Sequence, residues 1–198
     1  MNEVVGNIEQ ERQDVYNALV GLDAFGFWLV QADMEPAEPP VREKPHVWRF
    51  AEFEPLLHRA AEIVPHELAD RRGIILRNPG CDPTRPSTTN TQYCAYSIYN
   101  PGEVFTPHIH SAAASRMLLE SDGKGYTNVE GEKCYLERGD LIITPGGTWH
   151  DHGNEGNEPM IWVDMLDIPV SILFNAAKFG WDYKENGVKM DRQSTTRS

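Results

Sequence analysis

An antiparallel β-sandwich or β-barrel preceded by helices is the fold class that this sequence predicts, and three observations support it. After Arg72 the chain consists of short runs rich in β-branched and aromatic residues. Glycine, proline, asparagine or aspartate separates these runs at intervals of about ten residues, which is typical of antiparallel all-β folds. Helical patterns occur only before the runs, which argues against a parallel α/β sheet. The runs are 73–77, 92–100, 115–120, 125–131, 132–137, 140–144 and 160–168.

The first element is expected to be a short amphipathic helix. Residues 8–22 place Val15, Leu19 and Leu22 among polar residues, a spacing that favours a helix with one apolar stripe. The stretch 33–45 is rich in proline and charge, so an extended arm or linker is expected there.

A second helix is expected to begin near Glu54 and Pro55, because proline is well accepted in the first turn of a helix. Pro65 is expected to end it or to begin another turn. The sequence therefore divides into a helical lead-in, a β-barrel and a polar C-terminal tail. The expected boundaries are 1–70, 71–175 and 176–198.

Composition limits the classes of partner and location. The 198 residues include 18 Lys and Arg against 30 Asp and Glu, a net charge of −12, so nucleic acid and anionic membranes are not expected as partners. The sequence has neither an apolar stretch that could span a bilayer nor the pattern of a secretory signal. The cysteines Cys81, Cys94 and Cys134 are odd in number and widely spaced, which favours reduced thiols in a cytoplasmic protein.

Four of the seven histidines form two i,i+2 pairs, His108 with His110 and His150 with His152. Because side chains alternate along a strand, each pair is expected to point to one face. If both strands line the inside of a barrel, the imidazoles can converge on one point. Three neutral imidazoles without a thiolate suit a divalent ion such as Fe(II), Mn, Zn, Ni or Cu. A six-coordinate ion bound in this way keeps open positions for a chelating substrate and dioxygen.

The residues around these pairs resemble the two signature motifs of the cupin family. The first segment contains Gly102, His108, His110 and Gly123, and the second contains Gly139, Pro145, Gly147, His150 and Asn154. The resemblance implies a small jelly-roll β-barrel with a metal in its lumen, in which the glycines make the turns between strands. Cupin folds host many functions, so this resemblance alone does not define the chemistry.

Arg116 departs from the common cupin pattern. Most metal-binding cupins have a glutamate ligand a few residues after the first histidine pair, whereas residues 111–115 contain no carboxylate and Arg116 follows them. By strand alternation Arg116 is expected on the same face as His108 and His110, if the strand has no bulge. A guanidinium does not ligate a cation, but it suits bidentate capture of a carboxylate. The alternative is a surface arginine.

The chain also resembles gentisate 1,2-dioxygenase and its ring-cleaving relatives, bicupin enzymes that act on salicylate-type hydroxybenzoates and hydroxynaphthoates. The stretch PHVWRFAEFEPLLHRAAEIVPHELADRRGIILRNPG resembles the helical lead-in of this family, and the strings HDHGNEG and LDIPV resemble its second motif and the following strand. The similarity extends from about residue 25 to residue 175 and implies a match to the N-terminal cupin half.

This resemblance implies an Fe(II) site formed by His108, His110 and His150. It implies that Arg116, six residues after the second histidine, binds the substrate carboxylate. It also implies that His152 hydrogen-bonds a ring hydroxyl of the substrate or relays its proton, since imidazole exchanges protons near neutral pH.

The resemblance implies two further substrate contacts. A second arginine precedes the Asn-Pro-Gly turn in this family, and Arg72 is the best match, with Arg77 as the alternative. An aromatic residue lines the pocket from the strand before the first motif, and Tyr93 stands at that place. The alternative for Tyr93 is a tyrosine of the barrel core.

The reaction implied by the resemblance is an extradiol-type ring cleavage. A 2-hydroxybenzoate such as gentisate would chelate the metal through its carboxylate and 2-hydroxyl oxygens, leaving a position for dioxygen. The bond between the carboxyl-bearing and hydroxyl-bearing carbons would then break, giving maleylpyruvate from gentisate. The metal and dioxygen carry the difficult step, while the protein supplies orientation and charge.

The one motif set in this chain leaves two questions open. Members of the resembled family usually contain two cupin barrels, so the chain is either a one-barrel relative that forms a homo-oligomer or a truncated product. Its function is expected to be ring cleavage, and the alternative is a non-catalytic cupin that binds a metal or a small aromatic acid. A one-barrel relative would cover apolar surface with a partner subunit.

Overall fold

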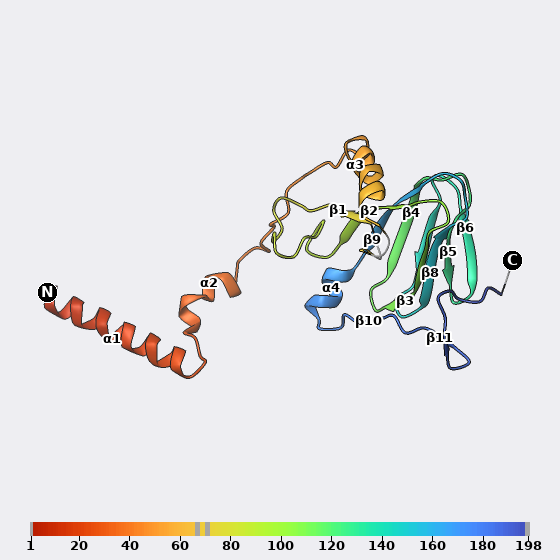
Figure 1. Cartoon of the computed structure of the whole chain (residues 1–198). Helices are drawn as coiled ribbons and strands as arrows, with labels where there is room; N and C mark the ends of the chain where they lie inside the picture. The colour runs from red at the N-terminus through yellow and green to blue at the C-terminus, as the bar shows by residue number, and fades with distance from the viewer. Residues whose placement is uncertain (1, 66–67, 70–71, 197–198) are drawn as a thin grey trace. The chain divides into compact units, whose positions relative to one another are not determined.

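The computed structural model describes residues 2–65, 68–69 and 72–196, and its helices and strands are labelled in Figure 1. The chain divides into two compact units. One unit ends at Val41, and the other begins at Arg42. The mainly β architecture expected from the sequence is confirmed, because ten strands of the second unit form two antiparallel five-stranded sheets. None of the described helices is long and apolar enough to cross a membrane.

The described part of the first unit contains one long helix and two short helical elements. Helix α1 spans Asn2–Gly21, the 3₁₀ helix η1 spans Phe27–Leu29, and helix α2 spans Gln31–Met34. The helix expected over 8–22 is therefore present and begins earlier. Beyond Glu35 the backbone has no regular helix or strand until Phe50, as the proline-rich composition of this stretch predicts.

Helix α3 spans Phe50–Ile63, so it begins four residues before the expected start near Glu54. Pro55 lies inside the helix, where it removes one backbone hydrogen bond. Packing against the sheet outweighs this cost, because Leu57 is fully buried and the rings of Phe50 and Phe53 lie 5.3 and 5.5 Å from that of Tyr96. Tertiary contacts rather than the proline therefore determine where this helix begins.

The two sheets supply a jelly-roll arrangement, and every β-rich run expected from the sequence contributes a strand. In spatial order the first sheet consists of β1 (Gly73–Ile75), β2 (Tyr93–Tyr99), β9 (Met160–Leu166), β4 (Ala114–Glu120) and β7 (Leu141–Thr144). The second consists of β10 (Phe179–Gly180), β3 (Val104–His110), β8 (Trp149–Asn154), β5 (Gly125–Val129) and β6 (Glu132–Leu136).

Two apolar clusters hold these layers together. The first cluster fills the lumen between the sheets, and the second lies between the first sheet and α3. Burial of side chains from both sheets and from the helix supplies the main favourable term for folding. The lumen cluster consists of Tyr99, Phe105, Leu118, Leu136, Met160 and Trp162. The helix-facing cluster consists of Leu57, Leu76, Tyr96, Ile98 and Ile161.

The segment after β9 adds structure to the barrel, in contrast to the polar tail expected over 176–198. Helix α4 spans Ile168–Leu173, and β10 then pairs with β3. Strands β11 (Lys184–Glu185) and β12 (Val188–Lys189) form a hairpin. Gln193 is only 5% exposed because its backbone N–H donates to Asp151 of β8 at 2.9 Å.

Candidate metal centre

A β-bulge in β3 aims two histidines into the barrel. Phe105 pairs with His152 and His108 pairs with His150, so β3 contains one extra residue between these pairs. The bulge contains Pro107, which has no N–H for a ladder hydrogen bond and is therefore tolerated at such a position. As a result Phe105, His108 and His110 are all buried, although strict alternation would turn Phe105 to the opposite face from the histidines.

His108, His110 and His150 converge in the lumen. Each offers one ring nitrogen, and these atoms all lie within 4.8 Å of one another. The ring centroids of His108 and His150, which face each other across the two strands, are 4.1 Å apart, and that of His110 lies 4.7 Å from His150. All three side chains are at most 1% exposed. The structure therefore brings these three predicted ligands together.

Hydrogen bonds define the tautomers of these three imidazoles. The Nδ1 atoms of His108, His110 and His150 lie 3.2, 2.7 and 3.0 Å from backbone carbonyl oxygens. A carbonyl only accepts, so each Nδ1 carries the proton and each Nε2 presents a lone pair. Neutral imidazoles oriented in this way by backbone acceptors form the donor set of a divalent transition metal. The residues present therefore fit a metal.

His152 lies beside this group but has a different partner. Its ring is 5.5 Å from that of His108 and 5.3 Å from that of His150, and it is 2% exposed. Its Nδ1 is 3.0 Å from the hydroxyl of Thr127, the residue directly opposite on β5. A hydroxyl both donates and accepts, so either ring nitrogen of His152 can carry the proton. This property separates His152 from the three histidines that face carbonyls.

Arg116 points into the lumen from β4 and is 2% exposed. Its Nε lies 2.7 Å from Oδ1 of Asp164, which is directly opposite on β9. Its Nη1 donates to the hydroxyl of Thr144 at 2.9 Å, and its Cζ lies 5.6 Å from the ring centroid of Trp162. Arg116 is therefore held from two sides, by an ion pair at Nε and by a hydrogen bond at Nη1.

Asp164 completes a polar network that the sequence analysis missed. Its Oδ2 accepts hydrogen bonds from Ser97 at 2.7 Å and from the indole of Trp162 at 3.0 Å. The signal was present in the run 160–168, where an acidic residue interrupts apolar neighbours on the inward face. Its partner Arg116 lies far away in sequence, so only the strand register between β4 and β9 reveals the pair.

A cavity of about 360 Å³ opens beside these groups. Tyr93 and Tyr99 of β2 line it together with Arg116 and His152. The wall therefore combines a guanidinium, an imidazole and aromatic rings, a composition suited to a small aromatic anion. The other lining residues are Gly73, Ile75, Ser97, Asp164, Leu166, Ile168 and Phe179.

Neither of the arginines considered as a second substrate contact lines this cavity. Arg72 is adjacent to the lining residue Gly73, so its side chain lies on the other face of the strand. There it is buried, forms an ion pair with Glu103 and donates to the carbonyl of Val64 at 3.3 Å. Burial lowers the pKa of Arg72 from its ordinary value. Arg77 is exposed beyond the end of β1.

The chain after β9 also reaches the histidines, which the sequence analysis did not anticipate. The ring of Phe179 on β10 lies 5.5 Å from that of His110, and the indole of Trp181 stacks on His108 at 5.3 Å with 28° between the planes. Gly180 pairs with Ile109, and a Cβ added to it would approach the side chain of Ile109 to 2.9 Å. In the sequence, this contact was indicated only by Gly180 standing between the aromatic residues Phe179 and Trp181.

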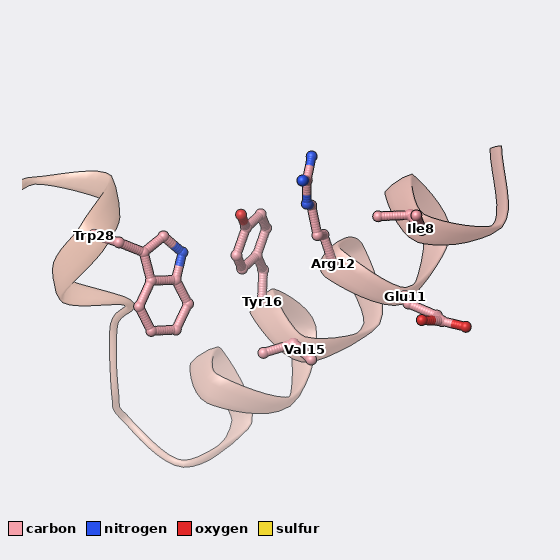
Figure 2. Close-up of a pocket in the computed structure, with 6 residues that line it drawn as sticks. All are labelled: Ile8, Glu11, Arg12, Val15, Tyr16 and Trp28. Carbon is pink, nitrogen blue, oxygen red and sulfur yellow. The ribbon is translucent and has the colours of Figure 1, made fainter. Parts of the chain in front are cut away.

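A second hollow, of about 450 Å³, lies in the N-terminal unit and has no comparable chemistry (Figure 2). The rings of Tyr16 and Trp28 lie 6.5 Å apart along it, and Ile8 and Val15 contribute apolar side chains. Trp28 is 61% exposed and Val15 49%, so this hollow is an open surface rather than an enclosed site. The barrel cavity is therefore the candidate functional site of the described residues.

Comparisons with known proteins agree with the fold. The model of the Cupin domain family matches residues 95–168. A gentisate 1,2-dioxygenase from Ralstonia sp is 38% identical over 178 residues, 89% of this chain and 50% of that protein. A 5-aminosalicylate 1,2-dioxygenase from Comamonas sp is 38% identical over 77% of this chain and 41% of that protein.

A solved structure of a relative has a similar fold. The salicylate 1,2-dioxygenase from Pseudoaminobacter salicylatoxidans, in its adduct with gentisate, aligns with a TM-score of 0.81 and 29% identity. The alignment covers 94% of this chain and 50% of that one. This chain therefore spans about half the length of the relatives that it matches.

Proposed function

The chain carries a cupin domain and matches gentisate 1,2-dioxygenases over about half of their length, and from this premise we propose that it functions in aromatic ring cleavage. The proposed reaction uses Fe(II) and dioxygen to open a 2-hydroxybenzoate, such as gentisate, between its carboxyl-bearing and hydroxyl-bearing carbons. One observation carries this proposal. Three buried, uniformly oriented imidazoles converge next to His152, which lines a cavity together with the buried guanidinium of Arg116.

His108, His110 and His150 would hold the iron, each through Nε2. Ferrous iron, when bound, supplies the redox chemistry by which dioxygen reacts with the aromatic ring. The backbone acceptors at Nδ1 keep the three rings oriented before the metal arrives, which reduces the entropy lost on binding. The protein would thus provide three preoriented imidazole ligands.

Arg116 would bind the substrate carboxylate through Nη2. Its other two nitrogens are engaged by Asp164 and Thr144, so the contact involves one nitrogen rather than the bidentate grip expected from the sequence. The two partners hold the guanidinium plane in one orientation, and this preorganisation favours a single substrate pose. Asp164 also offsets the charge of Arg116, so the metal would contribute much of the local attraction for an anion.

His152 would act on the ring hydroxyl of the substrate. Its side chain lines the cavity, and the hydroxyl of Thr127 can serve its Nδ1 either as donor or as acceptor. His152 can therefore exchange a proton at Nε2 without losing its hydrogen bond. Tyr93 and Phe179 would supply walls for the ring of the substrate.

Homo-oligomer formation is also part of the proposal. Met117, Leu141 and Ile143, on the outer face of the adjacent strands β4 and β7, are 38%, 54% and 58% exposed. A contiguous apolar surface of this kind is typical of a protein contact. Light scattering on the purified chain should give a mass above that of one chain, 22.4 kDa. A monomer would contradict this part of the proposal.

An oxygen-uptake assay tests the catalytic proposal. The protein is loaded with Fe(II) without oxygen, mixed with gentisate or salicylate, and then exposed to air. We expect oxygen uptake together with a new ultraviolet absorption band of the ring-opened product, and neither signal without iron. Binding of the aromatic acid without oxygen uptake would contradict catalysis and favour a non-catalytic binding protein.

A further inference from the structure

A second group of potential metal ligands lies outside the barrel lumen. Glu54 and His58 belong to α3, and Glu120 is the last residue of β4. One carboxylate oxygen from each glutamate and one ring nitrogen of the histidine all lie within 4.8 Å of one another. All three residues are partly buried. The imidazole makes this a mixed nitrogen and oxygen donor set, which distinguishes it from an ordinary acidic surface.

Helix α3 places Glu54 and His58 next to each other. Glu54 and His58 are four residues apart in a helix, so they lie one above the other on the same flank. Leu57, between them in sequence, is buried in the helix-facing cluster. The flank with Glu54 and His58 is therefore held next to the sheet by the packing of Leu57.

A β-bulge turns Glu120 towards this flank. Leu118 pairs with Trp162 and Glu120 pairs with Ile161, so β4 contains one extra residue, Leu119. Directly opposite residues share a face of the sheet. Ile161 belongs to the helix-facing cluster, whereas a regular register would pair Glu120 with Met160 of the lumen cluster. The bulge therefore moves a carboxylate out of the lumen and to the side of α3.

No charge-balancing partner of this group is found among the described residues. Among the residues that the structure describes, no side chain forms a hydrogen bond or an ion pair with Glu54, His58 or Glu120. Two carboxylates close together and partly removed from water repel each other, and a cation between them would relieve that repulsion.

We propose that Glu54, His58 and Glu120 form a second divalent-cation site, selective for an ion of the zinc class, that ties α3 to β4. Two carboxylate oxygens and one imidazole nitrogen match the three protein ligands of many zinc sites, with water in the fourth position. Tetrahedral zinc places its ligands about 3.4 Å apart, so small side-chain rotations would close the present arrangement. The site is independent of the proposed dioxygenase reaction.

Zinc titration of the metal-free full-length chain, read by calorimetry and elemental analysis, tests this site. We expect two equivalents in the wild type. His150→Ala should remove the lumen equivalent and keep the second. Glu120→Gln should weaken the second by at least about 100-fold, since even outer-shell changes cost 10- to 100-fold in affinity. Glu52→Gln, a matched change at an exposed position of α3, should leave both equivalents.

Hydrogen exchange gives a second readout that does not depend on counting ions. In the His150→Ala background, zinc at a hundred times its dissociation constant should slow exchange of the α3 amides by up to about 100-fold, because binding to the docked helix adds to its stability. His58→Gln should abolish this slowing. A single zinc equivalent in the wild type that His150→Ala removes, or unchanged zinc binding and exchange in both Glu120→Gln and His58→Gln, would overturn the proposal.

Discussion

The lumen of the barrel has an apolar half and a polar half, built from the same strands. Strand β3 contributes Phe105 to the apolar half and His108 to the polar half, and β4 contributes Leu118 and Arg116 in the same way. The apolar half is packed side chain against side chain. The polar half borders the cavity and contains four histidines and an ion pair.

This difference shows how one small barrel supports both stability and chemistry. Burying charged and polar groups costs free energy unless each finds a partner, and the polar half meets that condition through carbonyls, Thr127 and Asp164. The apolar half supplies the hydrophobic burial that keeps the strands in register. We expect substitutions in the two halves to affect different measured quantities.

The largest effect is expected from Leu118→Ala in the apolar half. Leu118 is 1% exposed, so its truncation should lower the free energy of unfolding by about 2–5 kcal/mol through lost burial and a cavity. Chemical denaturation measures this change. Leu173→Ala, at a position 74% exposed, is the control and should change stability by no more than about 0.5 kcal/mol. Equal losses in both variants would contradict the division into halves.

Arg116→Ala in the polar half should act mainly on substrate affinity. Loss of one charge-assisted hydrogen bond should raise the dissociation constant for gentisate by roughly 10- to 150-fold, measured without oxygen on the metal-loaded protein. Metal content should stay unchanged, because Arg116 is held by Asp164 and Thr144, whereas backbone carbonyls orient the three histidines. Loss of metal would show that Arg116 holds the histidines rather than the substrate.

A double variant sharpens this prediction. In Arg116→Ala the carboxylate of Asp164 is left without its cation and faces the anionic substrate. Arg116→Ala combined with Asp164→Asn should therefore bind gentisate more tightly than Arg116→Ala alone, while asparagine can still accept from Ser97 and Trp162. Weaker binding by the double variant would contradict the role of Asp164 as a charge partner of Arg116.

Thr127→Val should reduce turnover by about 3- to 10-fold, the size expected for one neutral hydrogen bond at His152. Metal content and gentisate affinity should change little, because the substitution keeps the shape of the side chain. Thr144→Val is the matched control, since it removes the hydroxyl beside Arg116 and should weaken gentisate binding instead. The oxygen-uptake rate at saturating substrate distinguishes the two, and equal rates in Thr127→Val and wild type would exclude the role of Thr127.

The smallest effect concerns pH and a group outside the lumen. Burial acts to raise the pKa of Glu155, but hydrogen bonds from Lys133 and Tyr135, each at 2.5 Å, outweigh it and hold the pKa below its ordinary value of 4.5. A carboxyl whose pKa is lowered in the folded state stabilises the protein at pH values above the pKa that this carboxyl has in the unfolded state. That contribution disappears as pH falls through the folded-state pKa. The wild type should therefore exceed Glu155→Gln in stability at pH 7 by at most about 1 kcal/mol.

Denaturation of both proteins between pH 7 and pH 3 measures this difference. The gap between wild type and Glu155→Gln should be constant down to about pH 5 and should then shrink towards zero. A gap that grows on acidification would mean that the carboxyl of Glu155 is stabilised in its protonated form.

The sequence predicted the β-rich fold and the convergence of three histidines because both depend on local patterns. Alternation with period two places His108 and His110 on one face, and the same holds for His150 and His152. Arg116 also points into the lumen, but it does so from β4 of the other sheet, so alternation along the strand of His108 and His110 does not explain its position. The helix boundary at Phe50 did not follow, because the aromatic packing of Phe50 and Phe53 on Tyr96 outweighs the local preference of Pro55.

Strand register separates what the sequence determined from what only the tertiary structure decided. The sequence determined which residues carry the donor atoms and the period that groups them. The pairing of Arg116 with Asp164, and the placement of Arg72 with Glu103 outside the cavity, required the three-dimensional arrangement. The physical reason is that cross-strand partners are chosen by register and by bulges such as that at Pro107, where one extra residue changes which face a side chain occupies.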